Sequence, residues 1–414
     1  MRIFFSVGEP SGDLHGANLI GELRRRTAAE FVGLGGPKMR AAGCELLHDM
    51  GELAVFGLWP VLARLPRFFR LLRDVQRSWD QSRPDAVVLI DYPGFNWHVA
   101  KQAKARGIPV FYYGLPQLWA WASWRVKKVQ RYVDHALCKL PFEEEWFRAH
   151  GCRATYVGHP YFDELRGQRL DAGFLAACRE QPGRLVTILP GSRTQEVKSN
   201  LPMLLAAAAR VRREVRGARL AIASYNEPQA ALARQIVAAG PVPAEVHCGR
   251  TPELIAAADC CLAVSGSVSL ELLYHAKPSV IVYRVSRWLY HVVRRMMRVR
   301  YITLVNLLGC DQPLAADGNP QPYEAGAAGH EQVLFPEYPT CQDRSADIAD
   351  HAIRWLTDEP QRQQLIAQLE TLREQVAAGG ASATAADYIV RELTAAPCVL
   401  PLPTAPPAAL RRAS

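Results

Sequence analysis

The stretch that decides the fold is Arg2–Gly16, with the sequence RIFFSVGEPSGDLHG. Its first part is a short apolar run, which predicts a buried strand at residues 2–7. Glycine and proline at positions 8–12 supply a turn, and the amphipathic pattern that follows predicts a helix over residues 13–26. A buried strand that passes through a tight turn into a helix is the repeating unit of a parallel sheet.

The same order of strand, turn and helix recurs along most of the chain. After a break at Pro182-Gly183 the pattern starts again. Strands are predicted at residues 86–90, 109–113, 183–189, 219–223 and 260–264, with helices after them that include residues 96–106 and one ending near residue 213. This alternation predicts an α/β protein with two Rossmann-like, doubly wound parallel-sheet domains that face each other across a cleft.

Composition suggests the limits of the domains. The polar stretch 160–182 separates the halves, so we expect an N-terminal domain of residues 1–165 and a C-terminal domain of residues 166–396 that ends in helices. A segment rich in glycine, proline and alanine at about 309–336 reads as an inserted surface loop. Five prolines in residues 397–414 predict a disordered tail.

Length and charge narrow the class of protein. The 414 residues are 49% hydrophobic and 21% charged, which excludes a disordered chain. A net charge of +9 suits nucleic acid, an anionic membrane or phosphorylated small molecules, and charge alone does not choose among these. Ten cysteines without a C-x-x-C pair are interpreted as reduced thiols of a cytosolic protein. No signal peptide or run of about 20 apolar residues is found, so any membrane contact is expected from the side.

Ligands of open parallel sheets bind beyond the carboxyl ends of the strands, so the turns after the strands are the candidate sites. The turn after the first strand holds Glu9, Ser11, Gly12 and Asp13, and the amides of a helix start attract anions. Asp91 directly follows four apolar strand residues, where a general base or a ligand anchor would lie, and Asn96 follows it. Helix capping by these side chains is the simpler alternative.

Two turns of the second half have the character of a diphosphate site. Arg193 places a fixed cation beside turn amides, and Glu271 stands one turn inside a later helix, where a carboxylate suits the hydroxyls of a ribose. The turn residues concerned are Gly191 and Ser192 in the first case and Ser265, Gly266 and Ser267 in the second. Ordinary turns and caps remain the alternative. The absence of a Walker loop and of a G-x-G-x-x-G fingerprint weakens kinase, ATPase and dehydrogenase interpretations. His159, in the segment VGHP that closes the first half, is a further candidate for the cleft.

Taken together, these turns resemble one family, the lipid-A-disaccharide synthases, which are inverting glycosyltransferases of the GT-B fold. The resemblance covers roughly residues 3 to 308 and rests on ten segments in the same order. They are SVGEPSGDLHGANLI, VGLGGPKM, ELAVFG, LIDYPGFN, LPQLWAW, LPFEEEWF, YVGHP, ILPGSRTQEV, AVSGSVSLEL and YITLVNLL.

The resemblance implies a reaction and roles for single residues. Members of the family join UDP-2,3-diacylglucosamine to 2,3-diacylglucosamine 1-phosphate and release UDP. Asp91 matches the family's general base, Arg193 with its neighbouring amides would hold the UDP, Glu271 would take the ribose, and Asn306 matches an asparagine near the nucleotide. No cofactor is implied, because the UDP-sugar is a substrate, and no metal, because no Asp-x-Asp pair is present.

Three departures from the family bear on the acceptor. Gly94 stands where many members carry a second aspartate, Ala122 stands where many carry arginine, and 309–336 looks inserted. They put acceptor contacts and chain-length preference in doubt.

We expect the protein on the cytoplasmic face of the inner membrane. Two basic and apolar segments are candidates for contact with this anionic surface. Residues 58–77 contain the expected contacts Trp59, Arg67, Phe68, Phe69, Arg70 and Arg73, and residues 284–301 hold six arginines and no acid. A core helix with a solvated arginine face is the alternative for 58–77.

Two other functions compete with the resemblance. One is a different UDP-sugar enzyme of the same fold, such as a UDP-N-acetylglucosamine epimerase. The other is a non-catalytic membrane or nucleic-acid binding protein, although no recognised nucleic-acid module is present, so we expect no nucleic-acid partner. A homodimer is left open.

Overall fold

The computed structural model describes residues 1–50, 61–314 and 333–395, with the side chains of residues 61–67, 293 and 294 excepted. Predictions that concern Trp59, the side chain of Arg67, most of the 309–336 insertion and the tail 397–414 therefore lie outside the described residues.

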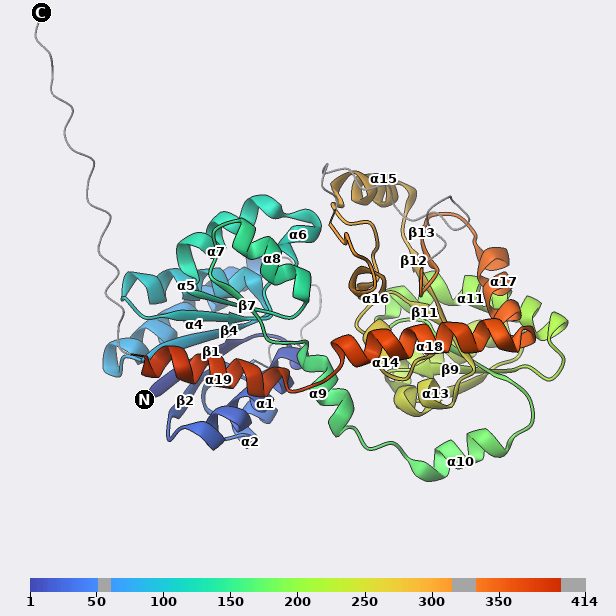
Figure 1. The fold of residues 1–414 in the computed structure, drawn as a ribbon, viewed down its shortest axis with the longest axis horizontal. Helices are drawn as coiled ribbons and strands as arrows, with labels where there is room; N and C mark the ends of the chain where they lie inside the picture. Colours follow the sequence, from blue (N-terminus) through green and yellow to red (C-terminus); the bar gives the residue numbers. More distant parts are fainter. Residues whose placement is uncertain (51–60, 315–332, 396–414) are drawn as a thin grey trace, which may run out of the picture.

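The first domain is built on a seven-stranded sheet in the order β3-β2-β1-β4-β5-β6-β7, and every neighbouring pair is parallel (Figure 1). Its strands are β1 (Arg2–Val7), β2 (Glu30–Gly35), β3 (Glu45–Asp49), β4 (Ala86–Ile90), β5 (Val110–Tyr113), β6 (His135–Cys138) and β7 (Ala154–Tyr156). Its helices are α1 (Pro10–Arg26), α2 (Pro37–Ala41), α4 (Val61–Gln81), α5 (Pro93–Ala105), α6 (Leu118–Trp121), the 3₁₀ helix η1 (Ser123–Arg125), α7 (Val126–Tyr132) and α8 (Pro141–Ala149).

The second domain repeats the plan with six parallel strands in the order β10-β9-β8-β11-β12-β13. These are β8 (Leu185–Leu189), β9 (Arg219–Ser224), β10 (Glu245–Cys248), β11 (Cys260–Val264), β12 (Ser279–Arg284) and β13 (Glu337–Thr340). The helices are α11 (Thr194–Glu214), α12 (Glu227–Ala238), α13 (Thr251–Ala257), α14 (Val268–Tyr274), α15 (Arg287–Met296), α16 (Leu304–Leu308), α17 (Ser345–Thr357) and α18 (Glu359–Val376). Helices α9 (Pro160–Gly167) and α10 (Ala172–Glu180) connect the domains.

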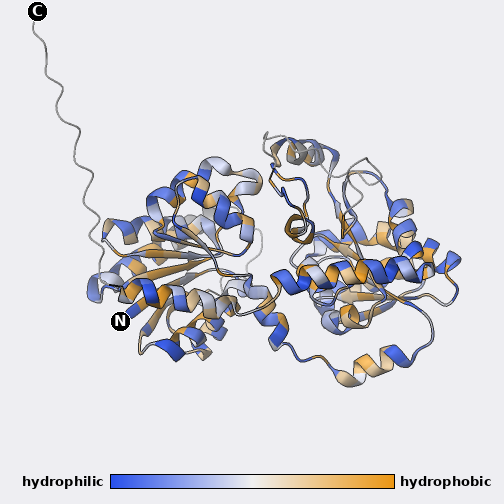
Figure 2. Ribbon diagram, in the orientation of Figure 1, coloured by the Kyte–Doolittle hydropathy of each residue, from blue (hydrophilic) through white to orange (hydrophobic). Residues whose placement is uncertain are grey.

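The prediction of two doubly wound parallel-sheet domains is confirmed. Figure 2 shows why the pattern could be recognised, because the strands are coloured hydrophobic and the outer helix faces hydrophilic. Helices α1 and α5 each begin three residues earlier than predicted, since Pro10 and Pro93 occupy the first helical position rather than the turn.

The C-terminal helix α19 (Ala381–Thr394) corrects one expectation about the domains. We expected all of 166–396 in the second domain, but α19 crosses back and packs against α1 and the first sheet (Figure 1). Ala385 and Ile389 are buried in that core, and the Tyr388 hydroxyl lies 3.0 Å from Nδ1 of His135. The carboxylate of Asp163 in α9 accepts hydrogen bonds from the first amides of α19, which fixes the return.

Two further findings concern the described residues only. All nine of their cysteines are free thiols. None of their helices is long and apolar enough to cross a bilayer.

Candidate active site

Asp91 stands at the carboxyl end of β4, in the centre of the first sheet, as the strand pattern predicts. Asp91 and Tyr92 adopt left-handed backbone conformations, with φ of 47° and 42°. Residues other than glycine rarely adopt this conformation, and where they do the surrounding structure has to hold it. The strained turn therefore marks Asp91 as a position whose exact placement is enforced.

Lys139 lies opposite Asp91 and was missed by the sequence analysis. Its Nζ atom is 3.5 Å from Oδ1 of Asp91, and both side chains are mostly buried. Lys139 directly follows β6, so the rule that found Asp91, a charged residue after an apolar strand, also applies to it. The amides of Lys139 and Leu140 donate to the buried Glu143 carboxylate, which fixes the backbone beneath the lysine.

Asn96 holds the turn and is not open to a ligand, contrary to our expectation. Its side chain is fully buried. The Nδ2 group donates to the carbonyls of Ser6, Ile90 and Asp91, and Oδ1 accepts from the Ser6 hydroxyl at 2.6 Å. The Tyr112 hydroxyl donates to the same Asp91 carbonyl at 2.7 Å. These bonds hold the left-handed backbone of Asp91.

The turn after β1 divides into exposed and buried residues. Glu9 and Ser11 are exposed. Partial desolvation and the nearby Asp91 raise the pKa of Glu9, while Arg193 and Lys139 oppose the rise. Gly12 is buried below Asp91, and a Cβ atom there would lie 2.8 Å from Cγ1 of Val7, so glycine is required for this close packing.

Asp13 has a structural role that the sequence pattern did not reveal. Its carboxylate accepts hydrogen bonds from the amides of Gly36, Lys38 and Met39 at 2.8 to 3.1 Å. The Asp13 carboxylate thus caps helix α2 and is not open to a ligand, contrary to our expectation.

Two histidines lie near the Asp91–Lys139 pair. Burial and Lys139 lower the pKa of His15 to about 4, and burial lowers the pKa of His159 well below its usual value. Both are therefore neutral at physiological pH. Nδ1 of His159 accepts the amide of Tyr161 at 3.3 Å, so His159 caps α9.

The turn after β8 differs from the expected anion site. The Glu196 carboxylate accepts hydrogen bonds from the amides of Ser192 and Arg193 at 3.0 and 3.1 Å. Gly191 permits this with a φ of 109°. The Arg193 side chain is 81% exposed and donates to the same glutamate. The amides of Ser192 and Arg193 are therefore already engaged, whereas the guanidinium is accessible.

The turn after β11 differs, because three of its backbone amides precede the first helical hydrogen bonds. The first hydrogen bonds of α14 run from the amides of Ser269 and Leu270 to the carbonyls of Gly266 and Ser267. The amides of Gly266, Ser267 and Val268 therefore precede the helical ladder, and Gly266 and Ser267 are exposed, whereas the amide of Ser265 bonds to Val282. Exposed amides at a helix start can donate hydrogen bonds to a phosphate.

Glu271 lies one turn inside α14 and is buried. The Tyr161 hydroxyl donates to its Oε2 atom at 3.0 Å, whereas buried Oε1 has no partner among the described residues. Burial raises the pKa of Glu271 to about 7, against the opposing effect of the Tyr161 hydrogen bond. A carboxylate with an unused acceptor is suited to a hydroxyl ligand.

The Asn306 side chain is used structurally and is already occupied by protein groups. Its Nδ2 group donates to the Phe335 carbonyl and to buried Glu337, and its Oδ1 atom accepts the Phe335 amide. Asn306 thereby holds α16 against the start of β13.

The two family departures occupy different surroundings. A Cβ atom on Gly94 would meet nothing within 4 Å, so an aspartate would fit there. Ala122 is fully buried in the first core, and an arginine would require repacking.

The domains touch beside this site. The Arg298 amide donates to the Ala120 carbonyl at 2.8 Å. Beneath it, Trp119 and Leu140 of the first domain pack with residues 299–307 of the second. Because Leu140 adjoins Lys139, this contact brings the second domain close to the Asp91–Lys139 pair.

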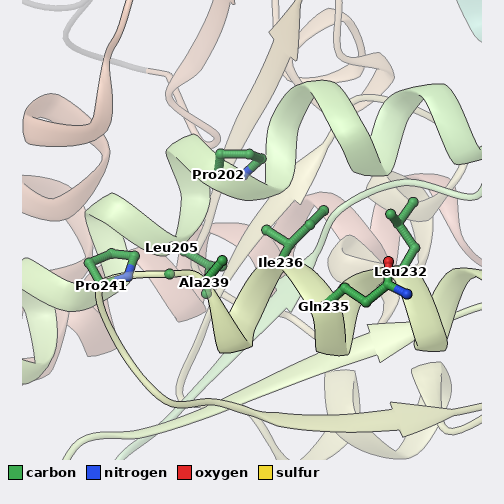
Figure 3. A pocket seen from close by; sticks show the side chains of 8 residues that line it. Pro202, Leu205, Leu232, Gln235, Ile236, Ala239 and Pro241 are labelled. Atoms are coloured by element: carbon green, nitrogen blue, oxygen red, sulfur yellow. The ribbon is translucent and has the colours of Figure 1, made fainter.

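One hollow lies elsewhere, between α11 and α12. Figure 3 shows its mostly apolar lining, which includes Pro202, Leu205, Leu232 and Ile236 together with the polar side chain of Gln235. It offers too few polar groups for a nucleotide. Among the described residues no group of three or more His, Cys, Asp and Glu side chains could hold a metal ion.

Comparison with known proteins gives one family. The family model for lipid-A-disaccharide synthetase matches residues 3–313. The lipid-A-disaccharide synthase of Myxococcus xanthus is 34% identical over 398 residues, covering 95% of this chain and 97% of the relative. That of Geobacter metallireducens is 35% identical over 395 residues, with 95% and 97% covered.

Solved structures share the fold at low identity. The UDP-GlcNAc 2-epimerase from Neisseria meningitidis bound to UDP-GlcNAc superposes with a TM-score of 0.59 at 10% identity, covering 95% of this chain and 99% of that one. The calicheamicin glycosyltransferase CalG4 gives a TM-score of 0.52 at 16% identity, with 95% and 98% covered. These likenesses support the two-domain fold alone.

Proposed function

Since the chain belongs to the lipid-A-disaccharide synthase family, we propose that it transfers 2,3-diacylglucosamine from its UDP donor to the 6-hydroxyl of 2,3-diacylglucosamine 1-phosphate. The products are the β-1,6-linked lipid A disaccharide 1-phosphate and UDP. The observation that carries the proposal is the position of Asp91, held in a strained turn at the carboxyl edge of the first sheet. Its charge acts on Glu9, and so does the charge of Arg193 of the second domain.

The proposed reaction is a single displacement. Asp91 accepts the proton of the acceptor's 6-hydroxyl as that oxygen attacks the anomeric carbon. The bond from the anomeric carbon to the UDP oxygen breaks with its electron pair on UDP, so the α-linked donor gives a β-linked product. Lys139 holds one oxygen of the Asp91 carboxylate in place.

The donor binds at the edge of the second sheet. Arg193 and the exposed amides before α14 neutralise the diphosphate, which develops charge as it leaves. We propose that this charge stabilisation needs no metal, so a chelator should leave turnover unchanged. Glu196 already engages the amides of Ser192 and Arg193, and we therefore assign the diphosphate chiefly to the turn 265–267.

Glu271 takes the ribose hydroxyls in this proposal, which predicts a pH dependence. Its pKa of about 7 means that the carboxylate is mostly protonated at pH 6 and mostly ionised at pH 8. If the ionised form binds the diol, UDP affinity should rise by up to about tenfold over this range. Calorimetric titration of UDP into wild type and into Glu271→Gln at both pH values measures this change in affinity. The variant is the control, because any pH dependence that it keeps comes from the ionisation of UDP itself. Equal pH dependence in both proteins would refute the ribose role.

A product assay tests the proposed function. Disaccharide should form from UDP-2,3-diacylglucosamine and 2,3-diacylglucosamine 1-phosphate, and unacylated UDP-N-acetylglucosamine should not turn over. Epimerisation of the unacylated nucleotide without disaccharide would identify an epimerase instead. RNA binding with a steep salt dependence and no UDP affinity would favour the non-catalytic alternative.

The acylated substrates require access to a lipid surface, so we place the protein peripherally on the cytoplasmic face of the inner membrane. One of the contacts expected on helix α4 is buried. Phe68 packs inward against Phe95 and His98, whereas Phe69 is exposed, as are Arg70 and Arg73. Among the described side chains of α4, Phe69 is the only exposed aromatic residue, so we infer that other elements also face lipid. No nucleic-acid partner is needed in this account.

A further inference from the structure

Helix α15 carries an apolar stripe that faces away from the protein. Trp288, Val292 and Met296 follow one another at four-residue spacing and therefore share a helix face. Trp288 is 74% exposed and Met296 47% exposed. An amphipathic helix of a globular domain normally buries such a stripe. The apolar face of α15 is instead presented to the surroundings.

The first domain presents a similar surface at α6 and η1. Trp121 is 43% exposed and Trp124 57% exposed. The Arg125 guanidinium lies over both rings, with its Cζ atom 5.2 and 5.9 Å from their centroids. Aromatic rings held beneath a cation in this way are amphipathic groups, suited to the boundary between water and hydrocarbon.

The two surfaces meet where the domains touch. Trp121 directly follows Ala120, whose carbonyl accepts the Arg298 amide, and Arg298 is two residues beyond the end of α15. Figure 1 shows α6 and α15 on the same side of the molecule, above the two sheets. We call the exposed residues Trp121, Trp124, Trp288, Leu289 and Met296 the junction surface.

Charge indicates the partner of the junction surface. The sequence contains no acidic residue between Asp91 and Asp134, nor between Glu271 and Asp311. Exposed arginines flank the apolar stripe at positions 287, 295 and 298. Exposed tryptophans among arginines, with no acid nearby, match an anionic bilayer, in which the rings enter the interface and the guanidinium groups meet phosphates.

We propose that the junction surface docks on an anionic phospholipid bilayer through both domains at once. The inference rests on the proposed function only in that acylated substrates would enter from this side. Because the surface joins the domains at the Ala120–Arg298 contact, docking would hold the two domains in their packed arrangement. Of the two segments expected to face lipid, residues 58–77 and 284–301, the second contains α15, and the junction surface adds the tryptophans of α6 and η1 to it.

Flotation with lipid vesicles tests this proposal on the full-length protein. Wild type should float with vesicles of phosphatidylcholine containing 30% phosphatidylglycerol, and less with phosphatidylcholine alone. Trp121→Ser with Trp124→Ser, and separately Trp288→Ser with Leu289→Ser, should each lower the bound fraction at least fivefold. The fourfold variant should not float. Phe69→Ser should have a smaller effect, and Arg216→Glu, an exposed arginine in the turn before β9, should have none.

Two controls keep the result interpretable. Thermal unfolding midpoints of the variants should match wild type, because the changed side chains are exposed. Turnover of detergent-dispersed substrates should stay within twofold of wild type. A fourfold variant that floats like wild type overturns the proposal, as does a wild type that floats with neither vesicle. If wild type bound RNA or a second copy of itself instead of vesicles, and the variants lost that binding, the surface would be assigned to that partner. Failure to form disaccharide while these vesicle results hold would refute the proposed function alone.

Discussion

Replacing Asp91 with asparagine is expected to lower kcat by about 10²–10⁴-fold, the usual contribution of a general base. UDP affinity should remain within about twofold, because Asp91 belongs to the first domain and the proposed nucleotide contacts to the second. Asparagine keeps the shape of the side chain and can still accept a hydrogen bond from Lys139, but it cannot take up the acceptor's proton. Steady-state kinetics with calorimetric UDP titration measure both quantities.

Asp85→Asn is the matched control for this experiment. Asp85 lies at the opposite end of β4, where its carboxylate accepts the Arg2 amide at 2.7 Å. Its replacement should leave kcat within about twofold, since the change is far from the carboxyl edge. An Asp91→Asn variant that kept kcat within fivefold of wild type would show that Asp91 is not the base. Loss of UDP binding in that variant would instead indicate a structural role.

Asn96→Ala is expected to lower the free energy of unfolding by about 2–4 kcal/mol, because it leaves buried polar groups unpaired. The Ser6 hydroxyl loses its acceptor, the Ile90 carbonyl loses the Asn96 donor, and the Asp91 carbonyl keeps only the Tyr112 hydroxyl. Because those bonds also hold the strained turn, kcat should fall at least tenfold at temperatures where the variant remains folded. Urea denaturation followed by circular dichroism, with kinetics at low temperature, measures the two effects.

Asn226→Ala provides a graded comparison. Asn226 caps α12 with a single hydrogen bond to the Gln229 amide, so its loss should cost only about 1 kcal/mol. If Asn96→Ala were no more destabilising than Asn226→Ala, the hydrogen-bond network would not hold the Asp91 turn.

The sheets could be predicted because their signal is local. Each buried strand is a short apolar run that ends in small or polar turn residues, and this repeats in both halves. The same rule located Asp91, since a charged side chain directly after a buried strand must lie at the sheet edge. Lys139 meets the rule as well, but the run before it, HALC, begins with a histidine and is short.

Side-chain partners could not be predicted, because they depend on contacts between distant segments. Asp13, Asn96 and Asn306 occur in segments of the right composition, yet each faces buried backbone groups rather than solvent. A sequence pattern gives the position of such a residue but not the amides or carbonyls that it meets. Glu196 illustrates the same limit, since its carboxylate occupies amides that the turn appeared to offer to a ligand.

Helix α19 and Phe68 were misplaced for a related reason. An amphipathic pattern shows that one helix face is apolar without showing what covers it. The apolar face of α19 is covered by the first domain, and Phe68 of α4 is covered by Phe95. The apolar face of α15 is exposed.

The configuration of the product tests the central claim most directly. Wild type should convert the α-linked UDP donor and the sugar 1-phosphate acceptor into a 1,6-linked disaccharide in the presence of a chelator. Proton NMR of this product should show the large diaxial coupling of a β anomer at the new linkage, as a single displacement assisted by Asp91 requires. An α-linked product, or a β-linked product formed equally fast by Asp91→Asn, would contradict the account.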